Sequence, residues 1–394
     1  MRSVILFIAA LLLFPAAALA DGIAFTVVGA EMDVRATEQR AVMWLRDGEW
    51  EIHIQPVFER DAGAAAWVVP FPVQPTVESS SADFFDQLEL ITSPVFLKVC
   101  SEDSDGLFCF GCMGDRGDTL GPEGDLSGRI HVVVWEQGQV GDLDYVILSA
   151  DGGDNLVAWL DGAGYQLPPG TQDTIADYET EGVYFFVARL SEDADPEKPL
   201  APVRFILPDM QEPTYPLRLT ALGVPAGQKL DLTLWVVFPH EQAFLPESHP
   251  MRGLKDVPRD IEEFDEEFDE VIADNPSGVM VLLFGGMVRW SGVLGGQFCW
   301  DFPCVSFEEL GMEIPDWSEE IREIDQGEYW LYRFQTRLSA GSLAEDLTFE
   351  PAENGQNAWV SNIYIEYTCK QVAAMTWLLV LGMGLGVLRR IRRA

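Results

Sequence analysis

Short apolar-rich runs, separated by Gly, Pro, Asp and Asn, recur along most of the chain and predict β-strands. The clearest are Ala41–Arg46 and Glu49–Phe58, which are joined by Asp47-Gly48, the strongest short signal for a β-hairpin. A two-residue turn there would set Arg46 opposite Glu49 and Leu45 opposite Trp50. Further strands are predicted at Ala64–Phe71, Val95–Val99, Ile130–Trp135, Leu143–Leu148, Val183–Leu190, Val203–Leu207, Leu217–Leu222, Leu230–Phe238, Val279–Phe284, Tyr329–Thr336 and Trp359–Tyr367.

A few segments have the apolar spacing of a helix instead. In Asp260–Ala273 one apolar stripe is expected, and Asn275-Pro276 would end the helix; the stripe consists of Ile261, Phe264, Phe268, Val271 and Ile272. Ser81–Ile91 is predicted to be a helix with Ser81 as its N-cap. Asp154–Gly164 and Thr174–Glu181 are two shorter helix predictions.

These patterns predict an α+β, β-rich fold with mostly antiparallel, sandwich-like sheets, a few short helices and a C-terminal transmembrane helix. The order of segments predicts a signal peptide (1–20), a β-rich domain (21–250), a second α+β part packed on it (251–368) and a membrane anchor or sorting tail (369–394).

The first twenty residues have the features of a secretory signal peptide. Arg2 precedes an apolar run from Val4 to Phe14, and Ala18-Leu19-Ala20 supplies the small residues that a signal peptidase needs. Ala20 is therefore the predicted processing site, with Asp21 as the mature N-terminus.

The tail resembles a membrane anchor. Val372–Leu388 carries no charge and is followed by Arg389, Arg390, Arg392 and Arg393. As a helix it would span roughly 26 Å at about 1.5 Å per residue. The arginines place the C-terminus in the cytoplasm and the body outside it, in the periplasm or at the cell surface.

Cys369 has two incompatible predicted fates. As a processing site it would lead to loss of the tail; as a structural cysteine it would pair within the body, and the helix would stay.

The charge restricts the partners. The chain carries 64 acidic and 25 basic residues, a net charge of −39. Such a surface repels phosphate backbones, so nucleic acid is excluded as a partner. Disorder does not follow, because 48% of the residues are hydrophobic and can form cores. The expected partners are the membrane, through the C-terminal helix, and an envelope glycan or protein.

The other five cysteines are candidates for disulfides in an oxidising compartment: Cys100, Cys109, Cys112, Cys299 and Cys304. At least two bridges are expected, one closing Cys299–Cys304 and one joining Cys100 to Cys109 or Cys112. The C-x-x-C spacing of Cys109 and Cys112 also occurs in zinc and redox sites, but no second pair or close histidine completes a zinc site.

No motif identifies catalytic chemistry. The chain has four histidines. His53 and His131 lie inside predicted strands, where packing is the expected role. His240 and His249 could join Glu241 or Glu247 at a metal, but the H-E-x-x-H spacing is missing. Asp151–Asn155 resembles part of a calcium loop and is better explained by helix capping. The sequence also lacks a G-x-S-x-G motif, a P-loop and a dinucleotide fingerprint. We therefore assign no catalytic, cofactor-binding or metal residue and expect no cofactor.

Several segments, in this order, resemble a known family. They are Ala66–Pro72, Phe84–Leu88, Thr92–Pro94, Asn155–Leu160, Gly164–Pro168, Tyr184–Ala188 and Tyr215–Thr220. Together they are similar to a secreted bacterial family known only as domain of unknown function 2330. No activity is assigned to that family, so the resemblance implies no catalytic residue. The arrangement of Cys369, apolar span and arginines resembles a myxobacterial-type sorting signal.

The sequence thus favours an exported, membrane-tethered cell-envelope protein that serves as a non-enzymatic binding or structural module. The alternative is an envelope hydrolase that acts on a glycan through paired carboxylates.

Overall fold

The computed structural model describes residues 23–27, 38–55, 65–99, 132–150, 155–191, 194, 200–224, 227–239, 242, 244–256, 258–287, 294–298, 305–308, 313–326, 329–352 and 363–367. All six cysteines, Ala20, His131, His240 and the apolar run Val372–Leu388 lie outside these residues.

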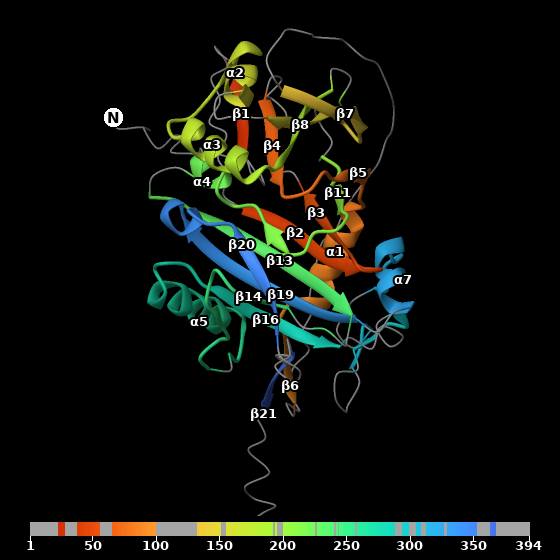
Figure 1. The fold of residues 1–394 in the computed structure, drawn as a ribbon. Coiled ribbons are helices and arrows are strands. Elements are labelled where there is room, and N and C mark those ends of the chain that lie inside the picture. The colour runs from red at the N-terminus through yellow and green to blue at the C-terminus, as the bar shows by residue number, and fades with distance from the viewer. Residues whose placement is uncertain are drawn as a thin grey trace, which may run out of the picture.

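Two large sheets form the body (Figure 1). The six-stranded sheet is antiparallel throughout, in the order β7 (Val132–Val140), β8 (Leu143–Ala150), β10 (Tyr184–Leu190), β4 (Ala65–Phe71), β1 (Ile23–Val27) and β9 (Tyr165–Gln166).

The eight-stranded sheet draws on a longer stretch of the chain. Its order is β15 (Met251–Arg252), β16 (Met280–Met287), β19 (Tyr329–Ser339), β13 (Lys229–Pro239), β2 (Glu38–Arg46), β3 (Glu49–Gln55), β11 (Val203–Leu207) and β5 (Thr76–Ser79). Two of its pairs, β13–β2 and β15–β16, are parallel. Strands from both sides of residue 250 therefore share one sheet.

Three smaller sheets complete the strands of the described residues. One has the order β12 (Thr214–Tyr215), β20 (Leu347–Pro351) and β14 (Phe244–Pro246), and another pairs β17 (Gln297–Phe298) with β18 (Val305–Ser306). The third is a parallel pair of β6 (Val95–Val99) and β21 (Ile363–Tyr367), in which Val99 faces Tyr367.

The main core fills the space between the two large sheets. Alternate residues of β3 (Trp50, Ile52 and Ile54) meet Trp67 of β4 and Phe186 of β10 in one buried cluster. Because side chains alternate along a strand, the intervening residues of β3 face the other side of the eight-stranded sheet.

Helices cover the outer faces of both sheets. α2 (Asn155–Gly162) and α3 (Thr171–Glu181) pack on the six-stranded sheet. On the eight-stranded sheet, α1 (Ala82–Thr92) and α7 (Glu319–Gln326) cover the middle strands, and α5 (Ile261–Asp274) covers β16. The result is a layered sandwich with its helices outside (Figure 1). The short helix α4 (Thr220–Gly223) and the 3-10 turn η1 (Ala340–Leu343) lie in connections.

The β-rich, mostly antiparallel fold with a few helices is confirmed, and so are its strongest local signals. Asp47 and Gly48 have φ of 53° and 88°, which suits a tight hairpin turn, and Arg46 pairs with Glu49 as predicted. Ser81 caps α1 by accepting a hydrogen bond from the backbone N–H of Asp83. Leu88 and Ile91, on the predicted face of α1, are completely buried.

Two local predictions are wrong. Leu217–Leu222 is not a strand: the backbone N–H groups of Leu217 and Arg218 donate to the Asp346 carboxylate, and the chain then turns into α4. Ile261 does not join the buried stripe of α5, since it is 56% exposed in the first turn, while Phe264, Phe268, Val271 and Ile272 are buried.

No helix within the described ranges is long and apolar enough to cross a membrane. The predicted transmembrane helix lies outside these ranges.

Candidate functional site

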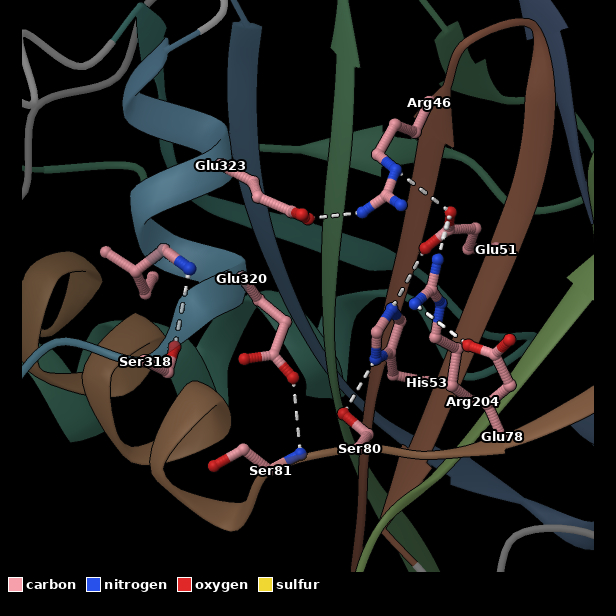
Figure 2. Close-up of polar contacts among 11 residues, drawn as sticks. Arg46, Glu51, His53, Glu78, Ser80, Ser81, Arg204, Ser318, Glu320 and Glu323 are labelled. Carbon is pink, nitrogen blue, oxygen red and sulfur yellow. Dashed lines mark hydrogen bonds and ion pairs between the residues drawn. The ribbon is translucent and has the colours of Figure 1, made fainter.

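Polar side chains gather on the outer face of the eight-stranded sheet, near the beginning of α1. Glu51 and His53 of β3 point to this side, because their neighbours Trp50, Ile52 and Ile54 face the main core. Strand register then aligns Arg204 of β11 with His53, and Glu78 of β5 with Arg204. We call this group the β3 polar cluster; it comprises Arg46, Glu51, His53, Glu78, Ser80, Arg204, Glu320 and Glu323 (Figure 2).

His53 lies at the centre of the cluster, between a hydroxyl and a carboxylate. Its Nδ1 is 2.8 Å from Oγ of Ser80, and its Nε2 is 3.5 Å from Oε2 of Glu51. Phe84 of α1 packs edge-on against the imidazole, with ring centroids 5.3 Å apart. His53 is completely buried, whereas Ser80 is partly exposed. The three side chains thus form a chain from the buried carboxylate to a hydroxyl near the surface.

Two arginines hold Glu51 in place. Its Oε1 is 2.7 Å from a guanidinium nitrogen of Arg204 and 3.3 Å from Nε of Arg46. Arg204 also pairs with Glu78 at 3.1 Å, and Arg46 pairs with Glu323 of α7. The cluster therefore ties β2, β3, β5, β11 and α7 together.

The ionisation states follow from burial and from these partners. Burial alone would raise the pKa of Glu51, but the close contact with His53, the hydrogen bond from Arg204 and the charges of Arg204 and Arg46 outweigh it, so the pKa lies below its ordinary value. Burial lowers the pKa of His53, against the opposing effect of the nearby Glu51 carboxylate. At neutral pH the cluster therefore holds an ionised Glu51 and a neutral imidazole.

Ser80 lies in the turn between a strand and a helix. β5 ends at Ser79, Ser81 is the N-cap of α1, and the backbone N–H of Ser80 donates to the carbonyl of Pro202 at 2.9 Å. The backbone N–H of Ser81 donates to Oε1 of Glu320 at 3.3 Å, so α7 reaches across to the beginning of α1 (Figure 2). The first N–H groups of a helix attract negative charge, which explains why a carboxylate lies there.

A second polar group, largely shielded from solvent, surrounds Asp346, and we call it the Asp346 joint. Asp346 accepts hydrogen bonds from the hydroxyl of Tyr178 at 2.7 Å and from Nε of Arg218 at 3.0 Å. Arg218 lies over the Tyr178 ring, 3.8 Å from its centroid, and also pairs with Glu181 of α3. Burial, together with the charge and hydrogen bond of Asp346, raises the pKa of Tyr178 well above its ordinary value. This joint connects α3 to the turns before α4 and β20.

The structure describes only some of the residues that the sequence singled out. The disulfide candidates Cys100, Cys109, Cys112, Cys299 and Cys304, and the processing candidates Ala20 and Cys369, lie outside the described residues. His249 is buried between Ser248 and the carbonyl of Ser342, at 3.0 Å from each. Within the described ranges no group of three or more His, Cys, Asp and Glu residues is arranged to hold a metal ion.

Sequence reasoning missed the role of His53 and did not consider Ser80. It predicted a packing role for His53, and the histidine is indeed buried, but its ring bridges two polar groups. The available signal was weak. Glu51 and His53 lie two residues apart on a predicted strand, and three serines precede a predicted helix.

The chain belongs to a class of layered β-rich proteins with helices on the outer faces of both sheets. Within that class, the family model of DUF2330, described as an uncharacterized protein conserved in bacteria, matches residues 15–350. The chain is therefore a member of the DUF2330 family, as its segments at Ala66–Pro72 and Tyr215–Thr220 suggested. Comparisons with curated proteins and with solved structures found no match.

Proposed function

We propose that the chain is an exported, membrane-tethered cell-envelope protein whose body is a binding or structural module. The export signal ending at Ala20 and the apolar run Val372–Leu388, with its terminal arginines, support the location. β21 ends at Tyr367, only a few residues before the apolar run, and pairs with β6. The body would therefore lie close to the membrane surface.

The proposal of a binding or structural role rests on the ion pairs that the charged side chains of the β3 polar cluster form with one another. Glu51 contacts two arginines, and each of these contacts a second carboxylate, Glu78 or Glu323. These charges hold strands and a helix together, as the Asp346 joint does elsewhere. Such ties favour a rigid scaffold that presents a surface, with a neutral or basic partner suited to a chain of net charge −39. An envelope glycan or protein fits that description.

The alternative, a glycan hydrolase acting through paired carboxylates, needs one carboxyl with a raised pKa to act as the acid. Glu51 has a lowered pKa. Burial raises the pKa of Asp231, with a further contribution from Asp269, but Arg337 bonds to both carboxylates and lies between them. Neither Glu51 nor the pair of Asp231 and Asp269 therefore gives the hydrolase alternative much support.

Fractionation tests the location. The full chain should stay with membranes through an alkaline wash, and protease added outside the cytoplasm should digest its body. A chain truncated after Tyr367 should become soluble, whereas a control truncated after Leu388, which keeps the apolar run, should still associate with membranes.

A full chain that washes off membranes, or whose body resists protease until the cytoplasm is opened, would contradict the proposal. The intact mass of the envelope form decides the fate of Cys369, because removal of the tail would leave a chain that ends near that residue.

A further inference from the structure

We propose that Ser80 is a nucleophile for acyl transfer, with His53 as its general base and Glu51 as the group that orients the imidazole. The substrate class is an ester or another activated acyl compound. This activity goes beyond the proposed binding role and depends on neither the tail nor the membrane.

The geometry meets the requirements for an activated serine. A nucleophilic hydroxyl needs a base within hydrogen-bond reach, and a third group must orient that base. Oγ of Ser80 is 2.8 Å from Nδ1 of His53. On the other side of the ring, Nε2 lies 3.5 Å from Glu51, a contact of the kind that often shortens when substrate binds. The residues come in the order Glu, His, Ser along the chain, and such sites are recognised by geometry rather than by order.

The charge states suit the same roles. A neutral imidazole can accept the Ser80 proton, and an ionised Glu51 stabilises the imidazolium that forms. Arg204 and Arg46 oppose that second effect, since both already bind Glu51. Because burial, with a smaller contribution from the charge of Arg204, lowers the pKa of His53, the imidazole is a weak base and we expect slow turnover.

The reaction balances with water as the second reactant. Oγ of Ser80 forms a bond to the carbonyl carbon, and its proton moves to Nδ1 of His53. The bond to the alcohol leaving group then breaks, and the alcohol takes up that proton. Water attacks the acyl-Ser80 ester by the same route and releases the carboxylic acid, which restores the serine hydroxyl.

The turn at Ser80 also supplies a donor for the developing oxyanion. Strand β5, the serine and helix α1 follow one another, and in strand–serine–helix sites the N–H after the nucleophile stabilises the oxyanion. Here that N–H belongs to Ser81, at the beginning of an 11-residue helix. Glu320 accepts its hydrogen bond at 3.3 Å, so the carboxylate lies where a substrate oxygen would bind (Figure 2).

Glu320 is therefore expected to restrain the reaction. A substrate must displace its carboxylate to reach the Ser81 N–H. Removing the carboxylate should raise reactivity by up to about 100-fold, the contribution of one oxyanion donor.

Labelling with a fluorophosphonate probe tests the proposal on the full-length protein in detergent. Wild type should be labelled at Ser80, as read from the modified peptide, and Ser80→Ala should abolish the label. His53→Gln should slow labelling about 100-fold, the usual contribution of a general base. Ser79→Ala is the matched control, because Ser79 is the exposed neighbour on β5 and should leave the rate unchanged.

The variant Glu320→Ala provides a second test that can be used if His53→Gln fails to fold. It should be labelled faster than wild type, and the rate should fall in acid as His53 becomes protonated. A wild type and a Glu320→Ala variant that both remain unlabelled at Ser80 would overturn the proposal. Labelling that is equally fast in a folded His53→Gln variant, or independent of pH, would overturn it as well. None of these outcomes depends on where the protein resides in the cell.

Discussion

The β3 polar cluster and the Asp346 joint both fix partly buried arginines to carboxylates, yet they differ in what they can do. In the joint, Asp346 meets an arginine and a tyrosine, neither of which changes charge near neutral pH. In the cluster, a buried histidine lies between Glu51 and a partly exposed serine. The comparison shows that similar ion pairs can have different roles. At Asp346 they make a contact whose charges do not change near neutral pH, whereas at Glu51 they surround a histidine that can titrate and, as we propose, activate a serine.

The largest effect is expected from breaking the Asp346 joint. Asp346→Ala would leave the Tyr178 hydroxyl, Nε of Arg218 and two backbone N–H groups without their acceptor, while Glu181 would still bind the rest of the Arg218 guanidinium. Loss of one partner of a largely buried pair should lower the free energy of unfolding by about 3 kcal/mol. Urea denaturation measures it. The neighbouring exposed Glu345→Ala should change it by less than about 0.5 kcal/mol. Equal effects of the two variants would show that the joint does not carry this stability.

The next effect comes from the cluster itself. His53→Gln keeps a polar side chain but loses the geometry that joins Ser80 to Glu51. The expected loss is about 1–2 kcal/mol, the cost of poorly satisfied buried polar groups. Chemical denaturation at pH 7.5 gives the value. A variant as stable as wild type would mean that the imidazole adds nothing to the folded state.

The β3 polar cluster and the Asp346 joint are expected to differ most clearly in how their contributions to stability depend on pH. The pKa of His53 in the folded protein lies below its ordinary 6.5, so below pH 6.5 the unfolded chain binds the extra proton and the folded chain does not. Stability that is fully present above pH 6.5 is therefore lost as the pH falls toward the folded pKa, at no more than about 1.4 kcal/mol per pH unit for one proton.

Denaturation at pH 7.5 and 5.5 tests this difference. Glu51 contributes little to the change in stability between these pH values. Its pKa lies below the ordinary 4.5, so the stability that it provides is lost only at lower pH. Wild type and Asp346→Ala should lose stability alike between the two pH values, whereas His53→Gln should lose less. A loss in His53→Gln as large as in wild type would assign the effect to other groups.

The smallest effect concerns the helix that begins at the cluster. Ser81→Ala removes the acceptor for the Asp83 N–H and should cost about 1 kcal/mol. Asp260→Ala at the exposed start of α5 removes a similar cap, bonded to the Glu263 N–H, and serves as the control. Similar losses in thermal unfolding would show that Ser81 acts as an ordinary cap. A much larger loss in Ser81→Ala would mean that the cap also supports the cluster.

Local features could be predicted because neighbouring residues determine them. Asp47-Gly48 has the chemistry of a tight turn, and the Ser81 cap needs only its own helix. The apolar spacing of Phe264, Phe268, Val271 and Ile272 is itself the buried face of α5. In each case the interaction that decides the structure spans only a few residues, so the sequence records it directly.

The sequence by itself thus determined most of the longer strands, the helices α1, α2, α3 and α5, the family and the candidate signals at both ends of the chain, but it did not predict β1, β5, β20 or α7. Only the tertiary structure decided that Leu217–Leu222 would turn, because the carboxylate that binds its backbone comes from Asp346. Tertiary contacts also brought Ser80 to His53, two strands away in the sheet, and Glu320 to the beginning of α1. Such contacts join segments far apart along the chain, and they form only once two sheets and their covering helices have packed, so no local period or spacing records them.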